Sequence, residues 1–407
     1  MKVLLKNKSF MFIWIAYITS GLGSTFSIFI MGWVAYHLKG SAVTVGNLWF
    51  FYFLSSIISQ IICGPYIDRV NKKNIMIFSE LVRAIVYFFF ALSMYQDSLT
   101  TNIIYTFAII VGLVEPLFSP SSNSYIAETI QEKDLQKANS ILQTTKQSTR
   151  MLGPLLAGLI VSMTEPLYVL IFLIVILGLS SINLLFLPNL NLNKSHKAGW
   201  GKEFIEGLMF YKKNPFFLTM GILLFIINFS AGAVQPMLLP YVFDYLKGTS
   251  FHYGLINSGT AFGMLIGAFF MTISNESKKL KLIMFSSIII GGLSLSLLGI
   301  SFNIFSSFLF ITIYGLCASI FNINNTILYQ KRVPTNLRGR VFTVRGLLAN
   351  AGVPLGALVI GHVVGYIKIN HVFLLLGLAI VIPCCIALFL PSLNYREDKE
   401  MGNSNTM

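Results

Sequence analysis

Charged residues are scarce in this chain. Asp, Glu, Lys and Arg make up 11% of its 407 residues, whereas soluble proteins carry about 25%, which excludes a protein with a wholly water-facing surface. Hydrophobic residues make up 55%, and most lie in twelve runs, each long enough to cross about 30 Å of hydrocarbon as a helix. We therefore predict an all-α membrane protein with twelve transmembrane helices. The runs lie near 10–36, 42–66, 74–95, 101–122, 140–163, 166–187, 216–243, 251–274, 280–300, 303–328, 341–366 and 371–391.

Residues that commonly carry catalysis or bind metals are also few. The four cysteines all fall within apolar runs, which favours a packing role over a disulfide framework or a metal site. The five histidines are dispersed and form no hydrolase arrangement. No Gly-x-x-x-x-Gly-Lys-Ser/Thr sequence occurs, so we expect no ATP hydrolysis. We expect no cofactor, no metal site and no enzymatic activity.

Basic residues outnumber acidic ones, 29 to 15, and are distributed unevenly. Apart from Lys39, Lys247, Lys368 and Arg83, all lie in or beside the termini and alternate connections between the runs. Positive residues are retained on the cytoplasmic side, so we expect a multi-pass protein of the plasma membrane with both termini cytoplasmic. The excess charge attracts anionic lipid, and its division among short segments argues against nucleic-acid binding.

The two halves of the chain resemble each other. Residues 38–41 (Leu-Lys-Gly-Ser) recur as 246–249 (Leu-Lys-Gly-Thr), and the Pro-Leu pair 154–155 recurs at 354–355. Stripes of small residues, which allow helices to approach closely, correspond as well: Ser55, Ser59 and Cys63 in the first half, and Gly259, Gly263 and Gly267 in the second. We therefore predict two pseudo-symmetric six-helix bundles. The expected units are bundles at 1–187 and 216–391, a cytoplasmic linker at 188–215 and a tail at 392–407.

The linker carries an amphipathic pattern. Phe204, Ile205, Leu208 and Met209 fall on one helical face, with charged residues on another. We predict a short helix lying at the cytoplasmic membrane interface.

Segment 64–73, Gly-Pro-Tyr-Ile-Asp-Arg-Val-Asn-Lys-Lys, joins the second and third runs. It resembles the Gly-x-x-x-Asp-Arg-x-x-Arg/Lys-Arg/Lys motif of the major facilitator superfamily. The resemblance implies the major facilitator fold and a cytoplasmic latch that closes in the outward-open state. The alternative is a charged turn that only sets topology, and the equivalent loop at 268–277 has no Asp-Arg pair. The implied latch residues are Gly64, Asp68, Arg69, Lys72 and Lys73, with Glu128 as partner.

A second resemblance concerns residues 150–158. Arg150, Gly153, Pro154 and Gly158 lie in a Gly-Pro-x-x-x-Gly sequence, similar to the Gly-Pro-x-x-Gly-Gly motif that is usual in exporters, and the proline predicts a kink. With Asn139 and segment 337–341 (Leu-Arg-Gly-Arg-Val), the chain resembles the macrolide-efflux and siderophore-export branch of the superfamily.

Glu115 is the carboxylate placed deepest in an apolar run. An isolated charge there is costly, and burial favours the neutral form of a carboxyl group, so Glu115 is our candidate for a proton-carrying residue. Ser119 and Ser122 share its helical face. The alternative is a structural carboxyl group that hydrogen-bonds to serine or to the backbone. We interpret Glu80 and Arg83 as a self-neutralising pair near the cytoplasmic end of the third run.

Polar side chains mark candidates for a substrate cavity. In the superfamily, spans one, four, seven and ten line the central cavity, and polar stripes lie on those four runs here. For each residue alone, hydrogen bonding between helices is an alternative role. The candidates are Tyr17, Ser20, Ser24 and Ser27, Ser119 and Ser122, Asn228 and Gln235, and Asn322 and Asn325.

The resemblance implies proton-coupled efflux of a hydrophobic or amphipathic small molecule, such as a macrolide-like drug. We expect a monomer whose two bundles rock about a central cavity. The alternatives are a siderophore or lysophospholipid carrier, a proton-driven importer, and a non-transporting receptor or scaffold on the same fold.

Overall fold

The computed structural model describes residues 7–67, 70–189, 200–274, 280–334 and 337–390, and the described part contains helices and no strand. The elements of the first half are α2 (Lys8–Lys39), α3 (Ala42–Ile67), α4 (Lys72–Tyr95), α5 (Thr101–Val114), η1 (Glu115–Leu117), α6 (Phe118–Thr129), α7 (Glu132–Met163) and α8 (Pro166–Leu185). The remaining elements are α9 (Trp200–Lys213), α10 (Pro215–Pro240), η2 (Tyr241–Tyr245), α11 (Ser250–Ile273), α12 (Leu280–Leu298), α13 (Ile304–Arg332), α14 (Arg338–Val363) and α15 (Ile369–Phe389).

Helix length and hydropathy agree with the predicted spans. Within the described residues, eleven helices are long and apolar enough to cross a membrane, with α5, η1 and α6 counted as one. The fifth predicted run lies in α7, which is 32 residues long but polar over its first half. These findings confirm the all-α membrane fold.

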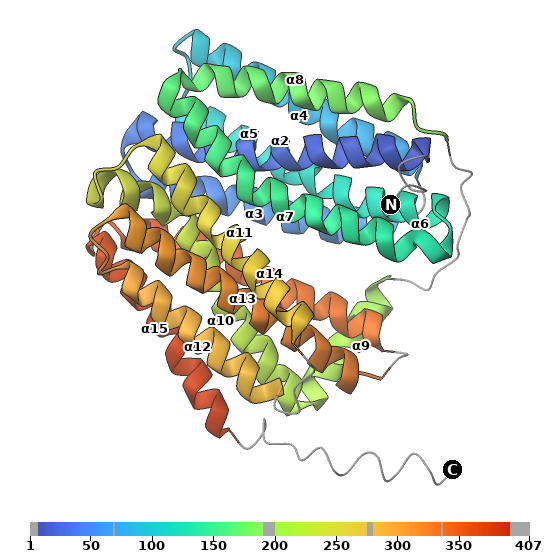
Figure 1. Ribbon diagram of the computed structural model, residues 1–407, viewed down its shortest axis with the longest axis vertical. Helices are drawn as coiled ribbons and strands as arrows, with labels where there is room; N and C mark the ends of the chain where they lie inside the picture. The colour runs from blue at the N-terminus through green and yellow to red at the C-terminus, as the bar shows by residue number, and fades with distance from the viewer. Residues whose placement is uncertain (1–6, 68–69, 190–199, 275–279, 335–336, 391–407) are drawn as a thin grey trace.

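The helices form two groups (Figure 1): α2–α8 lie in the upper part of the view and α10–α15 in the lower part. The same pairs of helices pack in both groups. The contact of α4 with α8 in the first group corresponds to that of α12 with α15 in the second, and the contact of α2 with α7 corresponds to that of α10 with α14. The small-residue stripes also pack equivalently. Ser59 Oγ donates to Leu113 O of α5 at 2.5 Å, and a Cβ on Gly263 would lie 1.9 Å from Thr312 O of α13.

The two groups touch at one end of the molecule. We call it the closed end, and it contains the connections from α2 to α3 and from η2 to α11. The opposite end, where α2 begins and α15 ends, is called the terminal end. In Figure 1 the ribbons of the two groups converge on the left and diverge to the right. Most contacts between the groups run from α7 to α11 and from α3 to α14, and α10 also contacts α2 and α3.

Glycines permit the close approach of the groups at the closed end. A Cβ on Gly158 of α7 would lie 2.6 Å from Ser250 O of α11, and one on Gly254 would lie 2.3 Å from Pro154 O. Likewise, a Cβ on Gly46 of α3 would lie 2.8 Å from the backbone of α14. The helix backbones therefore meet directly, without intervening side chains.

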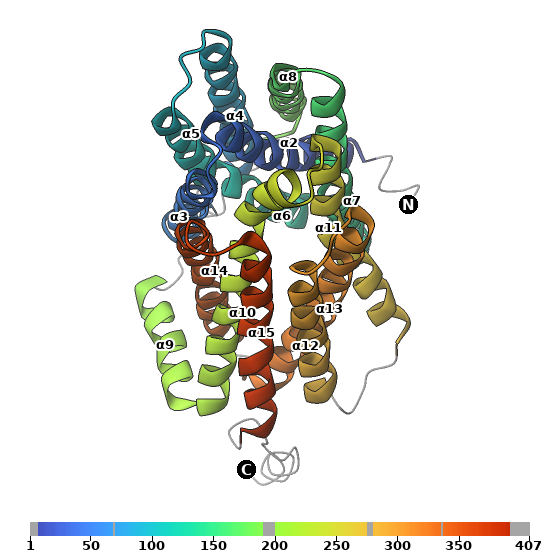
Figure 2. The ribbon, with the colours of Figure 1, turned by 90° about the vertical axis from the view of Figure 1, so that its left-hand side faces the viewer.

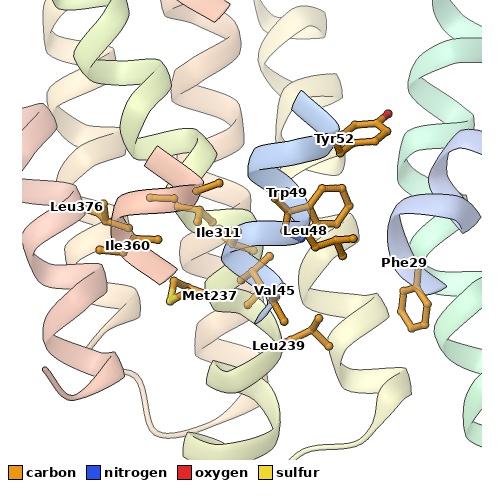
Figure 3. Packing of buried hydrophobic residues seen from close by; sticks show 14 of the residues in the cluster. Phe29, Val45, Leu48, Trp49, Tyr52, Met237, Leu239, Ile311, Ile360 and Leu376 are labelled. Carbon is orange, nitrogen blue, oxygen red and sulfur yellow. The ribbon is translucent and has the colours of Figure 1, made fainter. Parts of the chain in front are cut away.

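Polar and aromatic contacts also join the groups at the closed end. Tyr36 of α2 donates to Asp244 Oδ1 of η2 at 2.5 Å, and Trp33 Nε1 donates to Ser250 Oγ at 2.9 Å. Beside them, apolar side chains of α3 and α10 are buried together. Figure 3 shows Val45, Leu48 and Trp49 of α3 next to Met237 and Leu239 of α10.

Helix α9 packs against the second group, as the view in Figure 2 also shows. Glu206 forms an ion pair with Arg340 of α14, and the Tyr211 hydroxyl donates to the Tyr329 hydroxyl at 3.2 Å. Burial, and then the Tyr329 hydroxyl, raise the pKa of Tyr211 above the ordinary value of tyrosine, which keeps this donor protonated. The exposed side of the helix is apolar: Ile205, Leu208 and Met209.

Apolar side chains cover much of the outer surface. The outward faces of α4, α8 and α12 expose Phe88, Leu179 and Ile290, each by more than half of its surface. Such a belt suits contact with hydrocarbon rather than with water.

Candidate functional site

Glu115 lies where the fourth predicted span is interrupted. Helix α5 ends at Val114, the 3₁₀ turn η1 covers Glu115–Leu117, and α6 follows. Pro116 explains the interruption, because proline has no backbone N–H to continue the α-helical hydrogen bonding. The Glu115 side chain is 14% exposed, so it is largely but not completely buried.

A buried arginine lies next to this carboxyl group. Arg83 of α4 has no exposed surface, and its Nη2 lies 3.9 Å from Glu115 Oε2. Arg83 is the twelfth residue of the 24-residue helix α4, and Glu115 is at a similar depth in the next span. The interpretation of Glu80 and Arg83 as a pair near the cytoplasmic end of their span was therefore wrong for Arg83, which lies at mid-helix.

Glu80 is the second acidic neighbour of Arg83. Arg83 Nη1 lies 3.3 Å from Glu80 Oε1, and neither side chain is exposed. Ser20 of α2 donates to the same Glu80 oxygen at 2.6 Å, while Ser24 accepts from Arg83 Nη2 at 3.2 Å. Two carboxyl groups and one guanidinium group thus meet inside the first group of helices, and we call Glu80, Arg83 and Glu115 the buried charge cluster.

Further polar groups surround this cluster. Tyr52 of α3 lies beside Glu115, and the Tyr87 hydroxyl is close to Arg83 and bonded to Ser27. Several atoms of the cluster have no hydrogen-bond partner among the described residues, and such buried groups are uncommon in folded proteins. They are Glu80 Oε2, Arg83 Nε and Glu115 Oε2.

The sequence interpretation missed that Glu80 and Arg83 belong with Glu115. It treated the first two as a local pair and Glu115 as isolated. Equal depth in consecutive spans was the available signal, because antiparallel neighbours of similar length bring their midpoints together.

The polar stripe of α2 faces α4. Ser20 and Ser24 contact Arg83, Ser27 contacts Tyr87, and Tyr17 is buried against Phe118. These cavity candidates therefore take part in hydrogen bonding and packing between helices of the first group.

The remaining cavity candidates are dispersed. Ser119 is half-buried, and the Ser122 hydroxyl is buried with no hydrogen-bond partner in the part of the chain that the structure describes. In α10, Asn228 donates to Leu224 O of its own helix, and Gln235 is half-buried. Asn322 is exposed, whereas Asn325 is fully buried and neither of its amide atoms has a partner within the described residues.

The latch residues that are described form contacts within the first group. Lys72 pairs with Glu128 at 2.8 Å, and Lys73 Nζ donates to Leu185 O and Leu187 O at the end of α8, at 2.8 and 2.7 Å. Gly64 lies in α3, and Asp68 and Arg69 lie outside the described residues.

The residues of the helix-five motif face two different neighbours. A Cβ on Gly153 would lie 1.9 Å from Thr25 Oγ1 of α2, whereas Gly158 meets α11. Helix α7 continues through Pro154. Arg150, one turn before Pro154, is exposed at the surface of the first group and lies within electrostatic range of Glu115 and Tyr52.

A pocket of about 360 Å³ opens at the closed end, away from the buried charge cluster. Both halves contribute to its lining, which includes Gly40, Ser41, Asp244, Gly361 and Lys368. Within the described residues no group of His, Cys, Asp and Glu has the arrangement of a metal site.

Comparison with known proteins agrees with this architecture. The model of the Major Facilitator Superfamily matches residues 13–357. Macrolide efflux protein A of Streptococcus pyogenes is 24% identical over 363 residues, which cover 87% of this chain and 88% of that protein. The multidrug efflux pump Tap of Mycolicibacterium fortuitum is 22% identical over 406 residues, covering 95% and 97% of the two chains.

Solved structures show the same fold. The nucleoside transporter NupG superposes with a TM-score of 0.80 at 15% identity, covering 96% of this chain and all of that one. The POT family transporter PepTSo gives 0.77 at 11% identity, with 95% and 98% covered. The membrane-spanning helices, the repeated packing and the family match lead to one conclusion: the chain is a membrane transporter that belongs to the Major Facilitator Superfamily.

Proposed function

We propose that this transporter exports a hydrophobic or amphipathic compound of the macrolide type in exchange for protons. The substrate class rests on the relatives, which include macrolide and multidrug efflux proteins. Exchange for protons rests on the buried charge cluster, whose two carboxyl groups face a single buried arginine.

The distribution of basic residues supports a cytoplasmic terminal end in the plasma membrane. With that orientation, the closed end faces outward, and the hydrogen bonds Tyr36–Asp244 and Trp33–Ser250 seal it. The conformation described is then the one that receives substrate from the cytoplasm.

Glu115 is the proton carrier in this proposal. The main observation that supports this role is the position of Glu115 beside Arg83. Arg83 already has Glu80 as a closer partner, at 3.3 Å against 3.9 Å. A second carboxylate that shares one cation gains less from ionisation than a carboxylate with its own partner. Glu115 is also the more exposed of the two acids, so protons reach it more readily.

Everted membrane vesicles test the exchange. With an acidic interior imposed, adding erythromycin to wild-type vesicles should dissipate the pH gradient, and vesicles carrying Glu115→Gln should show no response, because glutamine cannot release a proton. Glu165→Gln removes an exposed carboxylate beside α8 and should respond like wild type. Normal erythromycin-induced dissipation by Glu115→Gln would refute the assignment of Glu115 as carrier.

A further inference from the structure

The two acids of the buried charge cluster are held differently. Glu80 Oε1 receives a hydrogen bond from Ser20 and lies within reach of Arg83 Nη1, so serine and arginine fix the same oxygen. Glu115 Oε2 has a more distant arginine neighbour and no hydrogen-bond partner of its own within the described chain, and the Glu115 carboxyl group is in hydrogen-bond contact with Tyr52 rather than with arginine. Charge-assisted hydrogen bonds favour the ionised form of an acid, so the contacts of Glu80 with Arg83 and Ser20 oppose the cost of burying its charge, and we take Glu80 as the ionised acid of the two.

The two terminal nitrogens of Arg83 therefore face different partners. Its Nη1 contacts Glu80, and its Nη2 contacts Ser24 and approaches Glu115. The negative charge of Glu80 opposes ionisation of Glu115, whereas the positive charge of Arg83 promotes it.

We propose that Glu80 is a positioning residue for proton exchange: as the fixed counter-ion of Arg83, it prevents the arginine from holding Glu115 permanently in the ionised form. This inference rests on the proposed role of Glu115. It adds a second acid that transports no proton itself but sets the pH at which Glu115 exchanges one.

Other groups around Glu115 enter this balance. The titratable or charged side chains near it are Glu80, Arg83 and Tyr87 of α4, Tyr52 of α3 and Arg150 of α7. Arg150 is exposed and is unchanged in the variants below, so its electrostatic influence on Glu115 is common to the wild type and to those variants.

Replacing Glu80 by glutamine keeps the shape of the side chain and removes its charge. Arg83 is then left with Glu115 as its acidic neighbour, and ionised Glu115 is stabilised. Protonation of Glu115 should therefore require more acidic conditions, by about 1–3 pH units, the range for one close charge partner. Arg83→Gln should have the opposite effect, because Glu115 then faces the negative charge of Glu80 alone.

Infrared titration of the purified, lipid-reconstituted transporter measures this directly, without knowledge of the substrate. The C=O stretching band of protonated carboxyl groups is recorded against pH, and subtraction of the Glu115→Gln spectrum isolates the contribution of Glu115. In a Glu80→Gln background, the matching reference is Glu80→Gln with Glu115→Gln. The midpoint should fall in Glu80→Gln, rise in Arg83→Gln, and stay near the wild-type value in Glu80→Asp, which keeps the charge.

The outcomes separate the two proposals. A wild-type difference spectrum without a titrating band would remove Glu115 as carrier and with it the proposed proton exchange. A titrating band whose midpoint does not fall in Glu80→Gln would overturn only the role of Glu80. If Glu80→Gln does not yield a monodisperse protein, Arg83→Gln and Glu80→Asp still test the inference, since an unchanged or lowered midpoint in Arg83→Gln contradicts it.

Discussion

At the scale of single residues, Lys72 connects the start of α4 to the end of α6. Its side chain is 7% exposed, and its partner Glu128 is 41% exposed. A nearly buried ammonium group that loses its partner keeps the cost of desolvation, whereas the exposed carboxylate regains water.

We therefore predict that Glu128→Gln destabilises the protein by about 1–2 kcal/mol. The exchanged pair Lys72→Glu with Glu128→Lys should recover part of that loss. Thermal unfolding of the purified protein measures both effects, and Lys137→Gln, an exposed change on α7, serves as control with a shift below about 0.5 kcal/mol. Equal stability of Glu128→Gln and Lys137→Gln would show that the ion pair contributes nothing.

A functional candidate among single residues could be found from the sequence where a local rule, such as the cost of a charge in an apolar run, is enough to identify it. Glu115 was found because a carboxylate in an apolar run is costly, and its proton-carrying role stays a prediction. The contact between Glu115 and Arg83 depends on how α4 and η1 pack, which no local rule contains. The serine stripe of α2 likewise does not reveal whether it faces a cavity or Arg83.

At the scale of helices, the approach of α7 to α11 depends on the absence of side chains at Gly158 and Gly254. A branched side chain at either position collides with the backbone of the facing helix, which cannot give way as a flexible side chain does.

We predict that Gly254→Val separates the halves at the closed end. Spin labels on Lys39 and Lys247, in a background without the four native cysteines, should report longer distances than in the parent protein by double electron–electron resonance. Gly178→Val is the matched control, because a Cβ at Gly178 of α8 has no neighbour within 4 Å. Identical distance distributions for Gly254→Val and Gly178→Val would refute the role of the glycine contact.

Helix boundaries were predictable to the extent that hydropathy marks them. Each of the twelve apolar runs coincides with part of a described helix, but α7 begins at Glu132 and α6 continues to Thr129, beyond the runs at 140–163 and 101–122. Hydropathy detects only the part of a helix that suits hydrocarbon. A helix continues past that part where polar residues still satisfy its backbone hydrogen bonds.

At the scale of the whole molecule, the proposed orientation in the membrane rests on the distribution of basic residues. We predict that Ser98→Cys, between α4 and α5, reacts with a membrane-impermeant maleimide on intact cells, because that connection lies at the closed end. Gln131→Cys, between α6 and α7, should react only after the cells are made permeable. Both positions are exposed, so the result depends only on which side of the membrane each position faces. The reverse labelling pattern would contradict the proposed orientation and with it the proposed direction of transport.

The repeat in the sequence predicted the arrangement of two similar groups of helices, since the same pairs pack in each. How the groups contact each other was not predictable. That arrangement depends on which ends meet, and the sequence is compatible with contact at either end.

The glycine contacts between α3 and α14 and between α7 and α11 have a mechanical consequence. They are two separate places where backbone touches backbone, and two points define a line. For bundles that rock against each other, rotation about this line requires the least rearrangement of side chains, so it would act as a pivot. Bulk added at either point would then impede the motion itself, even where both end states remain accessible.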